Sequence, residues 1–332
     1  MSESTRQSAL APRHTALGSG LEDWNGMGTA WTYNTDPDRE HDAVREAAGL
    51  FDMSPLKKVW VRGADATAVV DASFSRDCRA IPPGKAAYGS VLSERGTVAD
   101  DAIAFNCGDQ GWLFVHGSGD SMAMLTASGA ERDASIVLDD DLHNIAVQGP
   151  LSLELVNAHA TAELGALRYF EHVETQLCGH PCRISRTGYS GERGYEVFVG
   201  SDAVLDVWDT LLASGAAQGV MPCSFTALDK VRIEAALLFY GYDMTDAHSP
   251  FEVGLGFTLA SNGEYRGKQA AFARRGAETI QPVGLVVAHD DALAGGETLM
   301  LDGQVVGTVN SPAYSHRLGQ SLALGHASPE AA

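Results

Sequence analysis

The stretch SRTGYSGERGYEVFV, residues 185–199, places three glycines at equal spacing between apolar flanks: Gly188, Gly191 and Gly194. The flanking runs CRIS and YEVFV predict two strands joined by a glycine-rich loop. A plain hairpin needs only one or two glycines, at its turn. Because glycine has no Cβ, a glycine at every third position indicates a backbone that closely approaches something flat or bulky.

Two side chains of this segment can face such a group. Tyr189 lies in the loop and can offer a ring face, and Glu196 shares one face of the second predicted strand with Phe198. A carboxylate on an apolar face needs two good donors. The ring N–H and exocyclic amine of an amino-pyrimidine present two donors side by side. The simpler interpretation is a glycine-rich hairpin with an acid at the surface.

The composition limits the kinds of partner. The chain has 332 residues, 43 acidic against 23 basic, and a net charge of −20. The negative electrostatic potential of such a chain repels phosphate backbones and anionic lipids, so we expect neither a nucleic-acid nor a membrane partner. Five scattered cysteines are typical of reduced intracellular thiols, and no apolar run approaches about 18 residues. We therefore expect a cytoplasmic protein.

The order of predicted elements favours a mixed fold. Residues 39–51 predict a short helix, residues 57–62 a strand, and residues 89–107 a hairpin with an SERG turn. Strands and helices then alternate without regular βαβ winding, which indicates an α+β class. After Gly267, short strands joined by Gly and Asp turns predict a separate small β domain.

The motif CGHPC, residues 178–182, combines cysteine and histidine closely enough to suggest a metal site. Gly and Pro between two predicted strands indicate a turn instead, and one such cluster supplies at most three ligands. We expect no metal.

Several further segments occur in an order that is known from one family: AVREAAGLFDMS, VRGADA, GTVADDAIAF, NIAVQGP, VRIEAALLFYGYDM and SPFEVGLGFTL. Together with the glycine-rich segment, they resemble the aminomethyltransferase family, the T protein of the glycine cleavage system and its folate-dependent demethylase relatives. The resemblance extends over residues 40–323. It implies three domains in a ring around a central tetrahydrofolate site. On that basis we expect a disordered N-terminus over residues 1–18, a folate-binding α+β region of two interleaved domains over 19–266, and a C-terminal β domain, barrel-like but incomplete, over 267–332.

The resemblance assigns roles to individual residues. The pterin-facing carboxylate falls on Glu196, and the loop tyrosine near the folate on Tyr189. The family's functional aspartate falls in the pair Asp100–Asp101, with Asp100 preferred as the catalytic residue. Strand alternation puts these two side chains on opposite faces, so the pattern alone cannot choose between them.

Three further residues are implied as cofactor-binding. Arg232, in LDKVRIEAA, corresponds to a residue that helps hold the folate tail or the site wall. Tyr314 and Arg317, in SPAYSHRLGQSLALG, belong to the family's closing motif near the site entrance.

Two departures from the family pattern influence the expected reaction. Pro55 stands where glycine cleavage proteins carry histidine, and Leu228 stands where they carry arginine. They favour a demethylase-like transferase that moves a methyl group, or an aminomethyl-derived methylene group, from a small methylated or aminomethylated donor to tetrahydrofolate. A flavoenzyme's folate domain, which would need an oxidase partner, is a related reading.

Two alternatives remain. One is the glycine cleavage T protein proper, an aminomethyltransferase whose partner is a lipoyl carrier protein. The other is a non-catalytic folate-binding accessory protein of iron–sulfur cluster maturation. Those accessory proteins carry a cysteine signature after the long helix, whereas the matching region here reads NGEYRGKQAA and has no cysteine.

Overall fold

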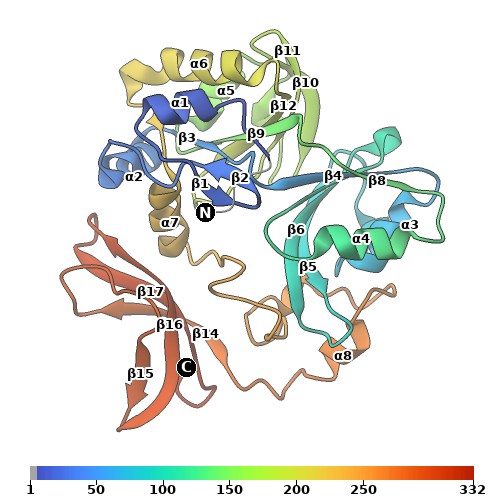
Figure 1. The fold of residues 1–332 in the computed structure, drawn as a ribbon, viewed down its shortest axis with the longest axis vertical. Coiled ribbons are helices and arrows are strands. Elements are labelled where there is room, and N and C mark those ends of the chain that lie inside the picture. The colour runs from blue at the N-terminus through green and yellow to red at the C-terminus, as the bar shows by residue number, and fades with distance from the viewer. Residues whose placement is uncertain (1–5) are drawn as a thin grey trace. The chain divides into compact units, whose positions relative to one another are not determined.

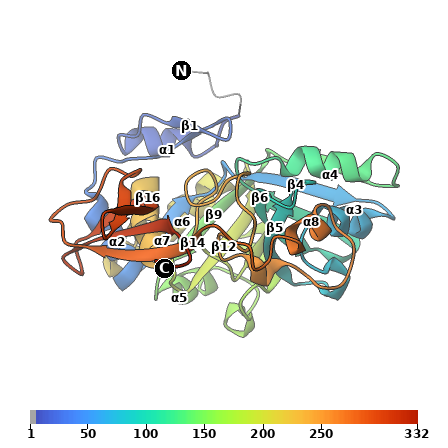
Figure 2. The ribbon, with the colours of Figure 1, turned by 90° about the horizontal axis from the view of Figure 1, so that it is seen from below.

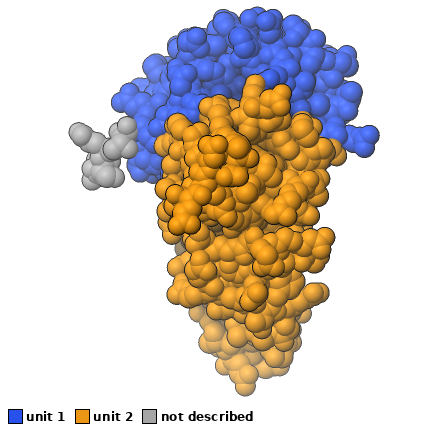
Figure 3. Space-filling model, turned by 90° about the vertical axis from the view of Figure 1, so that its right-hand side faces the viewer, with its two compact units in different colours: residues 1–58, 139–237 blue, residues 59–138, 238–332 orange. Residues whose placement is uncertain are grey.

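The computed structural model describes residues 6–332 (Figure 1). They divide into two compact units, which Figure 3 shows in different colours. The first unit comprises the chain up to Lys58 together with Asp139–Leu237, and the second comprises Val59–Leu138 and Leu238–Ala332. The chain therefore leaves the first unit and returns to it before it enters the C-terminal half of the second.

The first unit is built on a six-stranded sheet with strand order β10-β11-β12-β9-β3-β13. All neighbouring pairs are antiparallel except β13 with β3. The strands are β3 (Gly49–Asp52), β9 (Leu142–Gln148), β10 (His172–Leu177), β11 (His180–Ser185), β12 (Gly194–Gly200) and β13 (Met221–Pro222). A two-stranded ribbon and five helices complete the unit: β1 (Glu22–Trp24), β2 (Met27–Thr29), α1 (Ala11–Ala16), α2 (Pro37–Glu46), α5 (Ser152–Asn157), α6 (Val204–Gly215) and α7 (Phe225–Glu234).

The two faces of this sheet have different coverings. Tyr195 and Val197 of β12 face a core formed with α5 and α6, whose buried residues recur at helical spacing: Val204, Val207, Trp208 and Leu211. The opposite face carries Glu196, Ala146 and Phe51 in one row across β12, β9 and β3. Apolar residues of α7 pack with Ala146 and Phe51. Glu196 therefore lies on the face that α7 partly covers.

The N-terminal segment differs from its expected disorder. Residues 1–5 lie outside the described residues, but Leu10 is fully buried and α1 follows it. The buried His14 of α1 bonds through Nε2 to Asp52 Oδ2 at 2.9 Å, and Ser8 donates to the same oxygen at 2.6 Å. The small and polar residues of this segment suggested a disordered N-terminus, but two of them, Ser8 and His14, bind the buried carboxylate of Asp52 in β3. For residues 6–18 the expectation was wrong.

The second unit contains a five-stranded sheet with strand order β5-β6-β7-β4-β8. The strands are β4 (Lys57–Arg62), β5 (Ala86–Leu92), β6 (Val98–Asn106), β7 (Trp112–His116) and β8 (Ser135–Leu138). Helices α3 (Ala66–Ser73) and α4 (Ser121–Gly129) lie beside this sheet in both Figure 1 and Figure 2, and their apolar residues share its core. The expected hairpin is β5–β6, and Gly96 at its turn has φ +75°.

A separate antiparallel sheet ends the chain, with strand order β14-β17-β16-β15. Its strands are β14 (Gln281–Val287), β15 (Thr298–Leu301), β16 (Gln304–Ser315) and β17 (Gln320–Ala327), and the short α8 (Lys268–Phe272) precedes them. The expected α+β class with a small C-terminal β domain is confirmed. Among the described residues, none of the helices has both the length and the apolar character needed to cross a membrane.

Candidate functional site

The glycine-rich loop between β11 and β12 is shaped by a side chain of the neighbouring strand. A Cβ on Gly188 or Gly194 would overlap the amide of Gln148, which is fully buried at the end of β9. The Gln148 amide accepts from Ser190 Oγ at 2.8 Å and donates to the Thr187 carbonyl at 3.3 Å. Two of the three glycines thus make room for Gln148, so the close approach that the spacing indicated is, at these positions, to a neighbouring side chain.

Gly191 has a different reason to be glycine. Its φ of +77° lies in the left-handed region, and an added Cβ would come within 2.7 Å of Ala235 Cβ, just after α7. The loop is therefore packed against the end of α7.

Arg45 of α2 fixes the same loop, a role that the sequence pattern did not reveal. Its guanidinium donates to the Ser190 carbonyl at 2.8 Å and to Glu192 Oε1 at 3.1 Å. It also donates to Glu234 Oε2 of α7 at 2.8 Å. The planar fork of arginine joins α2, the loop and α7.

Glu196 is a buried acid and not a surface one. Its side chain is 7% exposed, Oε1 accepts from Asn144 Nδ2 at 2.9 Å, and Oε2 accepts from the Thr187 hydroxyl. Burial raises the pKa of Glu196, while the bonds from Thr187 and Asn144 oppose that rise. Because a carboxylate can accept about four hydrogen bonds, these two contacts leave room for ligand donors.

Two tyrosines belong to this part of the first unit. Tyr189 is partly buried against the apolar cluster of α7, and its hydroxyl donates to the Leu237 carbonyl at 3.4 Å. Tyr169, which the sequence reading missed, is 62% exposed and stands next to Phe170, a non-glycine residue with φ +63°. Burial, followed by the charge of Glu196, raises the pKa of Tyr169. The residue type gives no sign of the positive φ of Phe170, because phenylalanine rarely adopts it.

Arg232 is 2% exposed at the end of α7. Its Nε donates to Asp229 Oδ1 at 2.8 Å and its Nη1 to the Leu237 carbonyl at 3.1 Å. These bonds hold the chain where it leaves α7. Contact with a folate tail, which the resemblance implies, stays a prediction.

Asp100 and Asp101 have very different surroundings on β6. Asp100 is fully buried, and its Oδ2 receives Ser121 Oγ at 2.6 Å and His116 Nδ1 at 2.8 Å. Its Oδ1 accepts from the Asp101 backbone N–H at 2.9 Å. The preferred residue of the pair thus lies inside the core beneath α4.

Asp101 is partly exposed and accepts from the Tyr88 hydroxyl at 3.0 Å. Burial, together with the charge of Asp100, raises the pKa of Asp101 to about 7, although the bond from Tyr88 opposes the rise. A carboxyl that titrates near neutrality can both take and return a proton at physiological pH. Of the two carboxyls, Asp101 is therefore the one that reaches the surface, and the catalytic role of either residue stays a prediction.

The remaining predicted residues lie in the C-terminal sheet. Tyr314 is half-buried on β16, opposite Ser321 of β17, and Arg317 is exposed in the turn that joins these strands. Their role at a site entrance stays a prediction.

The first two residues of the CGHPC motif, Cys178 and Gly179, form the expected turn between β10 and β11, whereas Pro181 lies in β11 and not between the strands. Cys178 and Gly179 both have positive φ, 52° and 84°. Burial raises the pKa of Cys182 to about 12.

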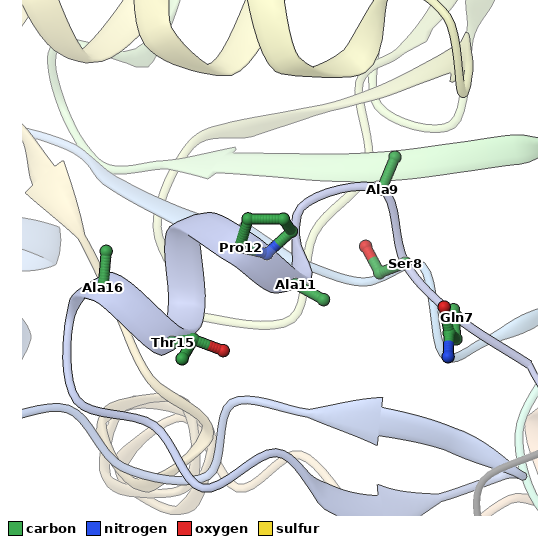
Figure 4. Close-up of a pocket in the computed structure, with 7 residues that line it drawn as sticks. All are labelled: Gln7, Ser8, Ala9, Ala11, Pro12, Thr15 and Ala16. Atoms are coloured by element: carbon green, nitrogen blue, oxygen red, sulfur yellow. The ribbon is translucent and has the colours of Figure 1, made fainter.

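A surface depression of about 720 Å³ lies along the N-terminal segment (Figure 4) and is lined by Gln7, Ser8, Ala9, Ala11, Pro12, Thr15 and Ala16. None of these side chains titrates near neutrality, and none was expected in the site. The depression is therefore lined by small or uncharged side chains, and none of them can act as an acid–base group.

Known proteins match this chain along its length. Residues 10–262 match the GCVT N-terminal domain, and residues 281–332 match the glycine cleavage T-protein C-terminal barrel domain. The chain belongs to the glycine cleavage T-protein family. This confirms the resemblance read from the sequence motifs.

The relatives that are similar to this chain are named for two different activities, oxidative N-demethylation and aminomethyl transfer. It is 40% identical to the heme-dependent oxidative N-demethylase gamma subunit of Ectopseudomonas mendocina, over 100% of this chain and 91% of the relative. It is 31% identical to the aminomethyltransferase of Streptomyces coelicolor, over 98% of this chain and 90% of the relative. The solved glycine cleavage system aminomethyltransferase T of Bartonella henselae shares the fold, with a TM-score of 0.87, 23% identity, and coverage of 97% of this chain and 90% of that one.

Leu228 and Pro55, the two positions that depart from the T-protein pattern, are both buried in the first unit. Leu228 is buried on α7 in the cluster that includes Phe51 and Phe225. The carbonyl of the buried Pro55 accepts from Arg6 at 3.1 Å and from Asn25 at 3.3 Å. Both residues therefore contribute packing or backbone contacts in the first unit.

Proposed function

We propose that this chain is a tetrahydrofolate-dependent one-carbon transferase that accepts carbon released by oxidative N-demethylation. The observation that carries the proposal is the placement of Asp101 on β6: a partly exposed carboxyl that accepts a hydrogen bond from Tyr88 and lies next to the buried Asp100. Burial and the charge of Asp100, which raise the pKa of Asp101 to about 7, support an acid–base role. Membership of the T-protein family supports folate as the acceptor, and the 40% identity to an oxidative N-demethylase subunit supports the source of the carbon.

Glu196 is the residue that we assign to the pterin. Hydrogen bonds from Asn144 and Thr187 hold its carboxylate in place. A ligand with two adjacent N–H donors therefore meets an acceptor that does not need to reorganise. The exposed ring of Tyr169, which is close enough for the charge of Glu196 to raise its pKa, offers an aromatic surface to a flat heterocycle. A pterin has both features, a flat ring and paired donors.

Asp101 is the acid–base group in this proposal. Oxidation of an N-methyl group by two electrons gives carbon at the oxidation level of formaldehyde. Condensation of formaldehyde with the two folate nitrogens forms two C–N bonds, releases one water and needs no redox step. Both nitrogen protons end on that water, so a group must remove them and deliver them to the departing oxygen. A carboxyl that titrates near pH 7 serves both transfers.

The oxidation itself is assigned to a partner. The relative with 40% identity is named as one subunit of a larger enzyme, and this chain matches 91% of that subunit. By analogy, an oxidising subunit would generate the one-carbon unit, and this chain would capture it. Capture would also keep a reactive aldehyde from other nucleophiles.

Aminomethyl transfer is the second candidate, favoured by the 31% identity to aminomethyltransferases. It uses the same acceptor and carbon at the same oxidation level, but takes the carbon from an aminomethylated lipoyl carrier. Leu228 and Pro55, where glycine cleavage proteins carry arginine and histidine, make this the weaker candidate.

Formation of methylene-tetrahydrofolate from formaldehyde tests the proposal. Because the two reactants also condense without an enzyme, the rate is compared with and without protein at low micromolar reactant. We expect acceleration at catalytic amounts of protein. A rate equal to the uncatalysed one with formaldehyde, together with turnover of an aminomethylated lipoyl carrier, would support the second candidate instead.

A further inference from the structure

A buried hydrogen-bond cluster lies directly behind Asp101 in the second unit. Asp100, on the same strand, accepts from Ser121 Oγ at 2.6 Å, from Ser121 N–H at 3.3 Å and from His116 Nδ1 at 2.8 Å. Asp100, His116 and Ser121 are each no more than 1% exposed. An ionised carboxylate only accepts hydrogen bonds, and this arrangement supplies it with donors on every side.

The orientation of His116 agrees with this pattern. Among the described residues, its buried Nε2 has no hydrogen-bond partner. A ring that carries its proton on Nδ1 leaves only a lone pair unmet at Nε2, whereas a proton on Nε2 would leave a buried donor unmet. The ring therefore directs its Nδ1 proton to Asp100. Ser121 is the first residue of α4, so the same carboxylate also lies at the positive end of that helix.

The cluster reaches Asp101 in two ways. The Asp101 backbone N–H donates to Asp100 Oδ1 at 2.9 Å, which fixes the strand at the point where the two side chains leave it in opposite directions. The charge of Asp100 also acts on Asp101 directly and raises its pKa. Tyr88 from β5 donates to Asp101. Asp101 also belongs to the carboxylates that act on Tyr240, whose pKa is raised to about 12 by burial and by Asp100, Asp246, Asp120 and Asp101.

We propose that Asp100, anchored by His116 and Ser121, is a positioning residue that fixes β6 at Asp101 and whose negative charge acts on the Asp101 carboxyl. Asp100 does not itself contact the reacting atoms. This inference rests on the proposed function for the chemical role of Asp101, but its effect on the Asp101 carboxyl can be measured without folate or any donor.

The test is a carboxyl titration by NMR with ¹³C-labelled aspartate in the full chain. The Asp101 signal is assigned as the one that disappears in Asp101→Asn. In the wild type we expect a midpoint near the value of about 7. In Asp100→Asn we expect the midpoint to fall by about 1 pH unit or more, because a neighbouring negative charge has been removed. Asp109→Asn is the matched control, since it removes an exposed aspartate charge from the same unit and should leave the midpoint unchanged.

Two results would overturn the proposal. One is an unchanged Asp101 midpoint in a folded Asp100→Asn variant. The other needs no variant: a wild-type midpoint near the ordinary aspartate value of about 4. If the midpoint moves as expected but the protein transfers no carbon to tetrahydrofolate, the proposed function fails while the coupling of the two aspartates stands.

Discussion

The hydroxyl of Tyr88 donates a hydrogen bond to Oδ2 of Asp101 over 3.0 Å, from β5 to the neighbouring strand β6. This bond lowers the pKa of Asp101 against the larger, opposite effects of burial and of Asp100. Together these effects bring the pKa of Asp101 to about 7. Tyr88 and Asp100 therefore act in opposite directions on the same group.

Replacing Tyr88 by phenylalanine should raise the pKa of Asp101 above about 7, because the donor that favours the charged form is lost. The acidic limb of the kcat/KM profile for carbon transfer should then move to higher pH. Tyr265→Phe is the matched control, because Tyr265 is a second-unit tyrosine whose hydroxyl bonds only a backbone carbonyl, that of Ala260, among the contacts described. A limb that moves to lower pH in Tyr88→Phe would contradict the assignment.

Glu196→Gln should weaken tetrahydrofolate binding by about 1.5–3 kcal/mol, the usual contribution of hydrogen bonds to a charged group. The fold should tolerate the change, since glutamine has nearly the same size as glutamate and its amide oxygen can still accept a hydrogen bond from Asn144 or Thr187. Calorimetry with tetrahydrofolate measures the effect, and the exposed Glu22→Gln serves as the control. Wild-type affinity in Glu196→Gln would make Glu196 a purely structural residue.

Gly188→Ala should lower the free energy of unfolding by about 1–3 kcal/mol, because the new methyl group overlaps the Gln148 amide in a packed loop. Urea unfolding gives the value. Gly20→Ala, at a position with open space around it, should have a much smaller effect. If the loss comes from this overlap, the double variant Gly188→Ala with Gln148→Ala should be less destabilised than the sum of the two single changes. Strict additivity would count against the packing account.

Two histidines of the second unit should make stability depend on pH. The rings of His248 and His326 lie 4.9 Å apart, and burial lowers the pKa of each below its ordinary 6.5. As pH falls through 6.5, the unfolded chain takes up protons first, so stability is lost below that pH and is retained above it.

Urea unfolding at about pH 7.5 and about pH 5.5 measures that loss. His326→Gln should reduce the difference in the free energy of unfolding between the two pH values. The exposed His289→Gln should not change it. An equal pH dependence in wild type and His326→Gln would show that other groups are responsible.

Local sequence pattern predicted the elements that carry the candidate site, because their signals are short-range. The SERG turn between apolar runs indicated the β5–β6 hairpin, and alternation placed Asp100 and Asp101 on opposite faces. Which face is the core depends on His116 and Ser121, which come 16 and 21 residues after Asp100. No local rule links these positions, so the sequence could not show that Asp100 is the buried member of the pair.

The glycine-rich loop shows the same limit. Its glycines are visible in the sequence, but their reason is the side chain of Gln148, 39 residues before Thr187, which its amide contacts. Arg45 acts on the loop from 145 residues away. Glycine spacing alone cannot distinguish room for a ligand from room for a neighbouring side chain.

Single-turnover transfer of ¹³C-formaldehyde carbon to tetrahydrofolate by Asp101→Asn tests the central claim most directly. We predict a rate about 10²–10⁴ below wild type, the usual effect of losing a general acid–base group, with tetrahydrofolate affinity nearly unchanged. Asp109→Asn should transfer carbon at the wild-type rate. A wild-type rate in Asp101→Asn would contradict the account.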